Sequence, residues 1–76
     1  MHYSNKYIVI KHEHHWIVKE QNSKFSIASC NIKQGAVDYA KILAKKHRPC
    51  SVEIFHANGN FEDEYIFGLK QFPGAG

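Results

Sequence analysis

The chain is short of several features that secreted, membrane and disulfide-stabilised proteins need. Its 76 residues include two cysteines, two prolines, one methionine and one tryptophan. Two cysteines are too few for a disulfide scaffold, and no apolar run approaches the roughly 18 residues of a membrane span. The segment 1–6 is too polar to open a signal peptide. We therefore expect a cytoplasmic protein with reduced thiols and no membrane association.

Sequence motifs for catalysis and cofactor binding are also missing. None of the five serines lies in a G-x-S-x-G elbow, and there is no glycine-rich phosphate loop. The acidic run Glu62–Glu64 is interpreted as a solubilising strand edge, because neighbouring strand residues point to opposite faces. A chain of this length has no room for both a core and a deep catalytic cleft. We expect a non-enzymatic protein that needs no cofactor.

What the chain does have is the composition of one small globular domain. Hydrophobic residues make up 43% of it, with five phenylalanines and four tyrosines, which is far from a disordered composition. We expect a single domain over residues 1–76 with its core in 7–67. The tail 68–76 is expected to be partly flexible, since Pro73 is followed by two glycines.

Residues 32–47 carry the strongest secondary-structure pattern. Asn31 with Gln34 three residues later has the form of a capping box, and Pro49 ends the pattern. At 100° per residue, one arc is mostly apolar and consists of Ile32, Ala36, Tyr39, Ala40, Leu43, Ala44 and His47. The pattern predicts a helix over 32–47 that packs through this arc.

Runs of β-branched and aromatic residues on both sides of the helix predict strands. Before the helix they are 7–11, 16–19 and a weaker 25–28, and after it 51–57 and 61–67. The last two flank Asn58-Gly59, the residue pair that a type I′ turn favours. The predicted fold is α+β: an antiparallel sheet of four to five short strands with one helix packed on one face, in the order β-β-(β)-α-β-β.

Three histidines crowd the first predicted turn, in the stretch His12-Glu13-His14-His15. His12 and His15 are expected to face each other across the hairpin, with about 5 Å between their Cβ atoms. A zinc site needs three or four ligands, and no spacing in the sequence completes such a set. We interpret these histidines as solvated turn residues and predict no metal site. His47, on the helix arc, and His56, on the inner side of its strand, are interpreted as packed side chains.

Several short motifs occur in order along the chain: Trp16-x-Val18-Lys19, Asn31 before Ile32-Lys33-Gln34, Ala36-Val37 with Ala40 and Leu43-Ala44, His56 with Asn58-Gly59, and Phe67-Gly68 with Phe72-Pro73. Taken together, they resemble a small prokaryotic family, domain of unknown function 2188. The resemblance spans about residues 7–73 and implies a hairpin–helix–hairpin unit; it implies no activity. The chain departs from the family at the first turn, which usually contains glycine, and at Asn60 and Glu62, where basic residues are frequent.

The two halves of the chain differ in charge. Residues 1–48 hold nine Lys and Arg against three Asp and Glu, whereas residues 49–76 hold one against four. Lys41, Lys45 and Arg48 form one exposed stripe of the helix, with Lys33 and Lys46 beside it. Such a stripe can bind the phosphate backbone of nucleic acid independently of sequence. The alternative is a solvated helix face, which lysines also form.

A second hypothesis comes from surplus apolar surface. Strands 7–10 and 16–18 are apolar on both faces, and Phe55 lies opposite the Val52 and Ile54 face of its strand. One helix covers only one face of a sheet, so the other face needs another cover: the tail with Phe72, a partner chain or stacked bases. The second hypothesis is therefore a homodimeric or accessory protein-interaction module that uses this outer face, with Ile17 and Phe55.

Overall fold

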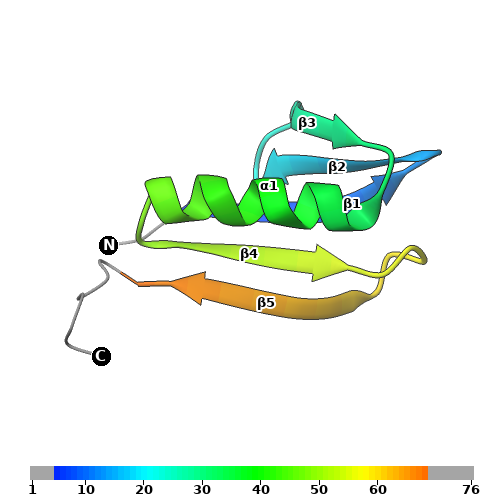
Figure 1. Ribbon diagram of the computed structural model, residues 1–76. Helices are drawn as coiled ribbons and strands as arrows, with labels where there is room; N and C mark the ends of the chain where they lie inside the picture. The colour runs from blue at the N-terminus through cyan, green and yellow to red at the C-terminus, as the bar shows by residue number, and fades with distance from the viewer. Residues whose placement is uncertain (1–4, 69–76) are drawn as a thin grey trace.

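The computed structural model describes residues 5–68, which form a five-stranded sheet with one helix across one face (Figure 1). The elements are β1 (Asn5–His12), β2 (His15–Glu20), β3 (Ser26–Cys30), α1 (Lys33–Lys46), β4 (Cys50–Phe55) and β5 (Phe61–Phe67). The predicted α+β class and the chain order of elements are confirmed, including the weak third strand. Residues 69–76 of the predicted tail, with Phe72-Pro73, lie outside the described residues.

The sheet is mixed, so the prediction of an antiparallel sheet was wrong. Its spatial order is β3-β2-β1-β4-β5, which differs from the order along the chain, and β1 pairs with β4 in parallel. The reason is the helix. The meander β1-β2-β3 leaves β3 parallel to β1, and α1 carries the chain back along the sheet, so β4 starts at the same end as β1. The parallel β1–β4 pair thereby joins the antiparallel meander β1-β2-β3 to the antiparallel hairpin β4-β5.

The two hairpin loops differ in form. His12 and His15 pair across the β1–β2 turn, and Glu13 adopts φ 58° there. The loop between β4 and β5 is not the predicted type I′ turn, because only Gly59, at φ 94°, has a positive φ. The amide of Gly59 instead donates to the carbonyl of His56 at 2.9 Å. The Asn58 side-chain oxygen also accepts a hydrogen bond from the amide of Asn60 at 3.0 Å.

The helix begins one residue later than predicted and packs through a rotated arc. Its N-cap is Ile32, which makes no side-chain capping bond, and Gln34 donates to Asp38 Oδ1 at 2.8 Å, so the capping box was wrong. Ile32, Tyr39 and His47 of the predicted arc are exposed. The residues buried from the helix are Ala36, Val37, Ala40 and Ala44. Small side chains on this arc let α1 approach the sheet closely, which leaves the larger Tyr39 at the rim.

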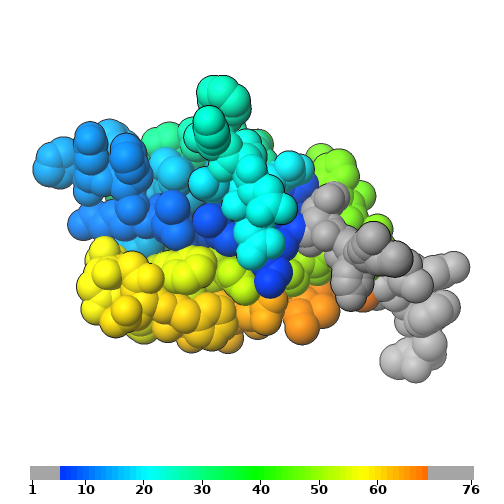
Figure 2. All heavy atoms as spheres, turned by 180° about the vertical axis from the view of Figure 1, so that it is seen from behind, coloured from blue at the N-terminus to red at the C-terminus, as the bar shows by residue number. Residues whose placement is uncertain are grey.

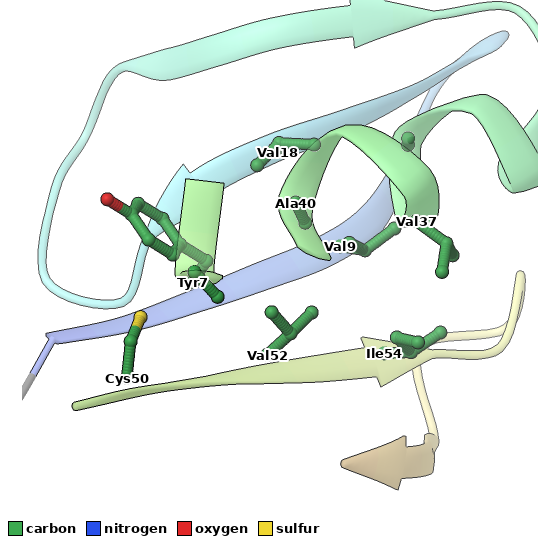
Figure 3. Packing of buried hydrophobic residues seen from close by; sticks show 10 residues of the cluster. Tyr7, Val9, Val18, Val37, Ala40, Cys50, Val52 and Ile54 are labelled. Carbon is green, nitrogen blue, oxygen red and sulfur yellow. The ribbon is translucent and has the colours of Figure 1, made fainter. Parts of the chain in front are cut away.

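The core lies between α1 and the inner face of the sheet (Figure 3). Val9 and Val18 from adjacent strands and Val52 from β4 are fully buried below the helix. Tyr7 and Ile54 extend the core along β1 and β4. Their alternation fixes the two faces: odd residues of β1 point to the helix, and even residues point to the outer face. Within residues 5–68, no helix is long and apolar enough to cross a membrane.

Candidate nucleic-acid interface

The side of α1 that faces β5 carries the predicted basic stripe. Lys41 and Lys45 lie one helical turn apart, and Arg48 follows the end of the helix. Lys41 and Arg48 are half-buried and Lys45 is exposed. Within residues 5–68, none of these three forms an ion pair with a carboxylate. Their charges are therefore available to an anion in solvent. We call Lys41, Lys45 and Arg48 the basic stripe.

Aromatic rings of β5 support two of the three cations. Lys41 Nζ lies 3.9 Å from the centroid of the Tyr65 ring, and Arg48 Cζ lies 5.4 Å from that of Phe67. Tyr65 and Phe67 alternate along β5, so both rings face the helix. A cation above an aromatic face is attracted by the ring quadrupole. The two rings hold the cations beside the sheet edge without neutralising them.

Lys33 and Lys46, the other two predicted binding residues, lie elsewhere. Lys33 forms an ion pair with Glu62 and lies 5.2 Å from the Trp16 ring centroid. Its charge is used within the fold. Lys46 is exposed, but the helical period places it about 100° from Lys45. Lys33 and Lys46 therefore lie apart from the basic stripe.

A groove of about 370 Å³ runs between α1 and β5, next to the basic stripe. Lys41 and Tyr65 line it on the side of the stripe, and the Lys33–Glu62 ion pair lines its other part. A carboxylate at that position repels phosphate. An anion is therefore favoured at the Lys41–Arg48 part of the surface rather than along the whole groove.

The histidines are surface residues. His12, His14 and His15 are exposed at the β1–β2 turn. His56 was predicted to pack inside its strand, but β4 ends at Phe55, and His56 is exposed with Nδ1 at 3.3 Å from Glu62 Oε1. His47 is exposed too, at 6.4 Å from Tyr7 between ring centroids. In residues 5–68 no three His, Cys, Asp or Glu side chains are grouped so that they could hold a metal ion.

The two thiols are separate from the basic stripe. Cys30 ends β3 and Cys50 begins β4, and neither is in a disulfide. Cys50 is buried, and burial raises the pKa of its thiol. A raised pKa keeps the thiol protonated at neutral pH, which makes Cys50 a poor nucleophile.

Ile17 and Phe55, the residues of the alternative hypothesis, lie on the outer face of the sheet. Ile17 pairs with Ile10 on β1, on the opposite face from buried Val18. Phe55 pairs with Phe61, and their rings meet edge to face with centroids 6.0 Å apart. Both Ile17 and Phe55 are half-buried by their neighbours.

The sequence did not predict that two aromatic rings lie beside the basic stripe. Tyr65 and Phe67 have the alternate spacing of a strand face, which is a visible signal. Their position beside Lys41 and Arg48 depends on which sheet edge β5 occupies. That edge follows from the parallel β1–β4 pairing, which no local sequence pattern determines.

The fold and this surface define a small α+β domain with a mixed five-stranded sheet and a basic helix face backed by two aromatic rings. Residues 6–67 match the model of a family described as an uncharacterized protein conserved in bacteria (DUF2188). The chain belongs to this family, which confirms the resemblance found in the sequence. No curated protein and no solved structure matches the chain.

Proposed function

We propose that the protein is a non-enzymatic cytoplasmic module that binds the phosphate backbone of nucleic acid, independently of sequence, through Lys41, Lys45 and Arg48. The observation that carries the proposal is the arrangement of three cations on one side of α1, with no ion pair to a carboxylate in residues 5–68. Lysine and arginine bind phosphate by displacing condensed counterions, and this contribution carries no sequence information.

The spacing of the stripe limits the number of contacts. Lys41 and Lys45 are separated by about 6 Å of helical rise, and Arg48 extends the stripe beyond the helix. Three cations neutralise three phosphates at most. For duplex DNA this predicts a slope of log K against log salt of about −2.7, or about 40-fold weaker binding at 200 mM than at 50 mM salt.

The test is fluorescence anisotropy with labelled duplexes of two unrelated sequences over a range of salt concentrations. Replacing Lys41, Lys45 and Arg48 together by glutamine is expected to flatten the salt slope to near zero. The matched control replaces Lys11, Lys19 and Lys24 by glutamine, which removes the same charge from elsewhere on the surface. It is expected to retain most of the slope.

Two results contradict the proposal. One is the absence of binding to either duplex at 50 mM salt. The other is an equal loss of affinity in the two triple variants, which would show that binding depends on the net charge of the protein and not on the basic stripe. If the stripe only compensates the helix dipole, the stripe variant loses stability in a denaturant titration without any change in binding.

A further inference from the structure

The outer face of the sheet has an apolar centre that no helix of residues 5–68 covers. α1 packs on the opposite face, and Figure 2 shows the outer face directly, with the cyan β2–β3 loop projecting across part of it. Ile10 and Ile17 pair across β1 and β2, and Phe55 and Phe61 pair across β4 and β5. Continuing the β1–β4 register one residue past Val9–Ile54 sets Ile10 beside Phe55. One apolar row, Ile17–Ile10–Phe55–Phe61, therefore crosses four strands.

A second row, two residues along β1, is charged and ordered by sign. Ile8 pairs with Lys19 of β2 on one side and with Glu53 of β4 on the other. Glu53 in turn pairs with Glu64 of β5. This row, Lys19–Ile8–Glu53–Glu64, is basic on the β2 side, apolar at the centre and acidic on the β5 side.

The ion pairs on this face leave its charges partly uncompensated. Lys6 Nζ lies 2.9 Å from Glu53 Oε2 and 3.7 Å from Glu64 Oε2, so two carboxylates share one ammonium group. Lys19 and Lys24 form no ion pair with a carboxylate of residues 5–68. Lys24 comes from the β2–β3 loop and lines a hollow with Ile17 and Lys19. The face is thus net basic on one side of β1 and net acidic on the other.

We propose that this face binds a second copy of the chain, with the two sheets packed face to face about a two-fold axis nearly parallel to β1. β1 is the central strand, so such a rotation sets β2 of one copy against β4 of its partner at the same height along the strands. Lys19 then faces Glu53 of the second copy, and Ile8 faces Ile8 of the second copy. The Ile17–Ile10–Phe55 row faces the same row in reverse order.

Two-fold symmetry requires a surface that complements itself, and this face meets that condition in charge and in apolar content. Lys6, which lies near the axis, is already neutralised by Glu53 and Glu64 of its own chain. The β2–β3 loop extends from the β3 edge across the middle of the face (Figure 2), and Lys24 on it lines the hollow beside Ile10 and Ile17. The rotation places Lys24 over the partner's β4–β5 side, where it faces Glu64. Aligned packing of two sheets at about 10 Å is a common arrangement for such faces.

The available area suits a reversible dimer. Five strands at about 4.8 Å spacing and roughly 20 Å in length give about 500 Å² of sheet per copy, or about 1,000 Å² in total before side-chain relief. That total is near the lower limit for specific interfaces. A concentration-dependent equilibrium is therefore expected rather than an obligate dimer.

The test is sedimentation velocity of the full chain from about 1 μM to 1 mM, a range that brackets micromolar affinities. The wild-type chain is expected to shift from monomer to dimer. Ile10→Asp is expected to raise the dimer dissociation constant by more than about 100-fold, because it buries two carboxylates against each other. Ile42→Asp, on the exposed side of α1, is the matched control and is expected to leave the constant unchanged.

Charge reversal tests the orientation of the two copies. Lys19→Glu sets a second carboxylate against the partner's Glu53 and is expected to weaken the dimer by about tenfold or more. Lys11→Glu changes net charge equally, but Lys11 is on the helix side of β1, and little effect is expected. Adding Glu53→Gln to Lys19→Glu is expected to recover part of the lost affinity.

Circular dichroism and thermal unfolding of each variant show that it is folded before its association is compared. A wild-type chain that stays monomeric at 1 mM overturns the proposal. If Ile10→Asp leaves the dimer intact, the outer face of the sheet is not the interface. If Lys19→Glu and Lys11→Glu weaken the dimer equally, the proposed orientation of the two-fold axis is wrong. None of these outcomes depends on nucleic-acid binding, because the variant of Lys41, Lys45 and Arg48 that tests that binding leaves the outer face of the sheet unchanged.

Discussion

Lys41 Nζ lies 3.9 Å from the ring centroid of Tyr65 and links α1 to the edge strand β5. A cation above an exposed ring contributes about 0.5–1 kcal/mol, and Tyr65 is 37% exposed. In a double-mutant cycle of Lys41→Gln and Tyr65→Leu, we expect a coupling free energy of unfolding in that range. The same cycle with Lys45→Gln is the control, because Lys45 lies one turn away. Equal coupling free energies in both cycles would contradict a specific interaction between Lys41 and the Tyr65 ring.

The second prediction concerns the packing face of α1. Leu43 is half-buried and packs against the core, whereas neighbouring Ile42 is 55% exposed. Leu43→Ala is expected to lower the free energy of unfolding by about 1–3 kcal/mol, less than for a fully buried leucine. Ile42→Ala is expected to change it by less than about 0.5 kcal/mol. Urea titration measures both, and the reverse ranking would contradict the described helix orientation.

The third prediction concerns the β1–β2 turn, where Glu13 adopts φ 58°. A side chain in this left-handed region costs about 1 kcal/mol or more, and glycine avoids the cost. We expect Glu13→Gly to raise the free energy of unfolding by about 0.5–1 kcal/mol. His14 has no positive φ, so His14→Gly should only add entropy to the unfolded chain. A melting temperature raised equally by both variants would be inconsistent with strain at Glu13.

The fourth prediction is a pH dependence. A hydrogen bond from Lys6 to Glu53, opposed by partial burial, raises the pKa of Lys6 above its usual value. The ion pair therefore stabilises the fold fully below the unfolded pKa of about 10.4, and this stabilisation is lost as pH rises through the higher folded pKa. Lys6→Met is expected to cost about 0.5–1 kcal/mol at pH 7.

The difference in stability between wild-type and Lys6→Met should shrink above about pH 10.4. Burial raises the pKa values of Tyr7 and Cys50, which lowers stability in alkali in both proteins. Their titration cancels in the difference, which isolates Lys6. Urea titrations at neutral and alkaline pH measure the difference. A constant difference across that range would contradict a stabilising role for the charge of Lys6.

The bounds of the helix and the position of the first hairpin were predictable from the sequence, because they depend on neighbouring residues. The helix ends within one residue of the prediction, since Pro49 and the loss of apolar period mark its end. The hairpin around His12 and His15 follows from two β-branched runs and a short polar gap. Features that depend on distant pairing were not predictable: the parallel β1–β4 contact, and with it the rings behind Lys41 and Arg48.

The errors at the helix have a common physical cause. Hydrophobicity alone favours Ile32 and Tyr39 as core residues, yet the close approach of α1 to the sheet selects the small side chains Ala36 and Ala40. Packing distance thus outweighs side-chain hydrophobicity on this face. At Lys33, the sequence shows the charge but not its partner, because Glu62 comes from the other hairpin.

The parallel pairing of residues 5–9 with 50–54 also governs how the protein forms during synthesis. The meander β1-β2-β3 emerges from the ribosome first and leaves one side of β1 as an open edge until β4 follows. An unpaired apolar strand edge is a template for aggregation, and long-range pairing forms slowly because loop closure costs entropy. A nascent chain halted before residue 50 therefore leaves the backbone N–H and C=O groups on this side of residues 5–9 without a partner strand.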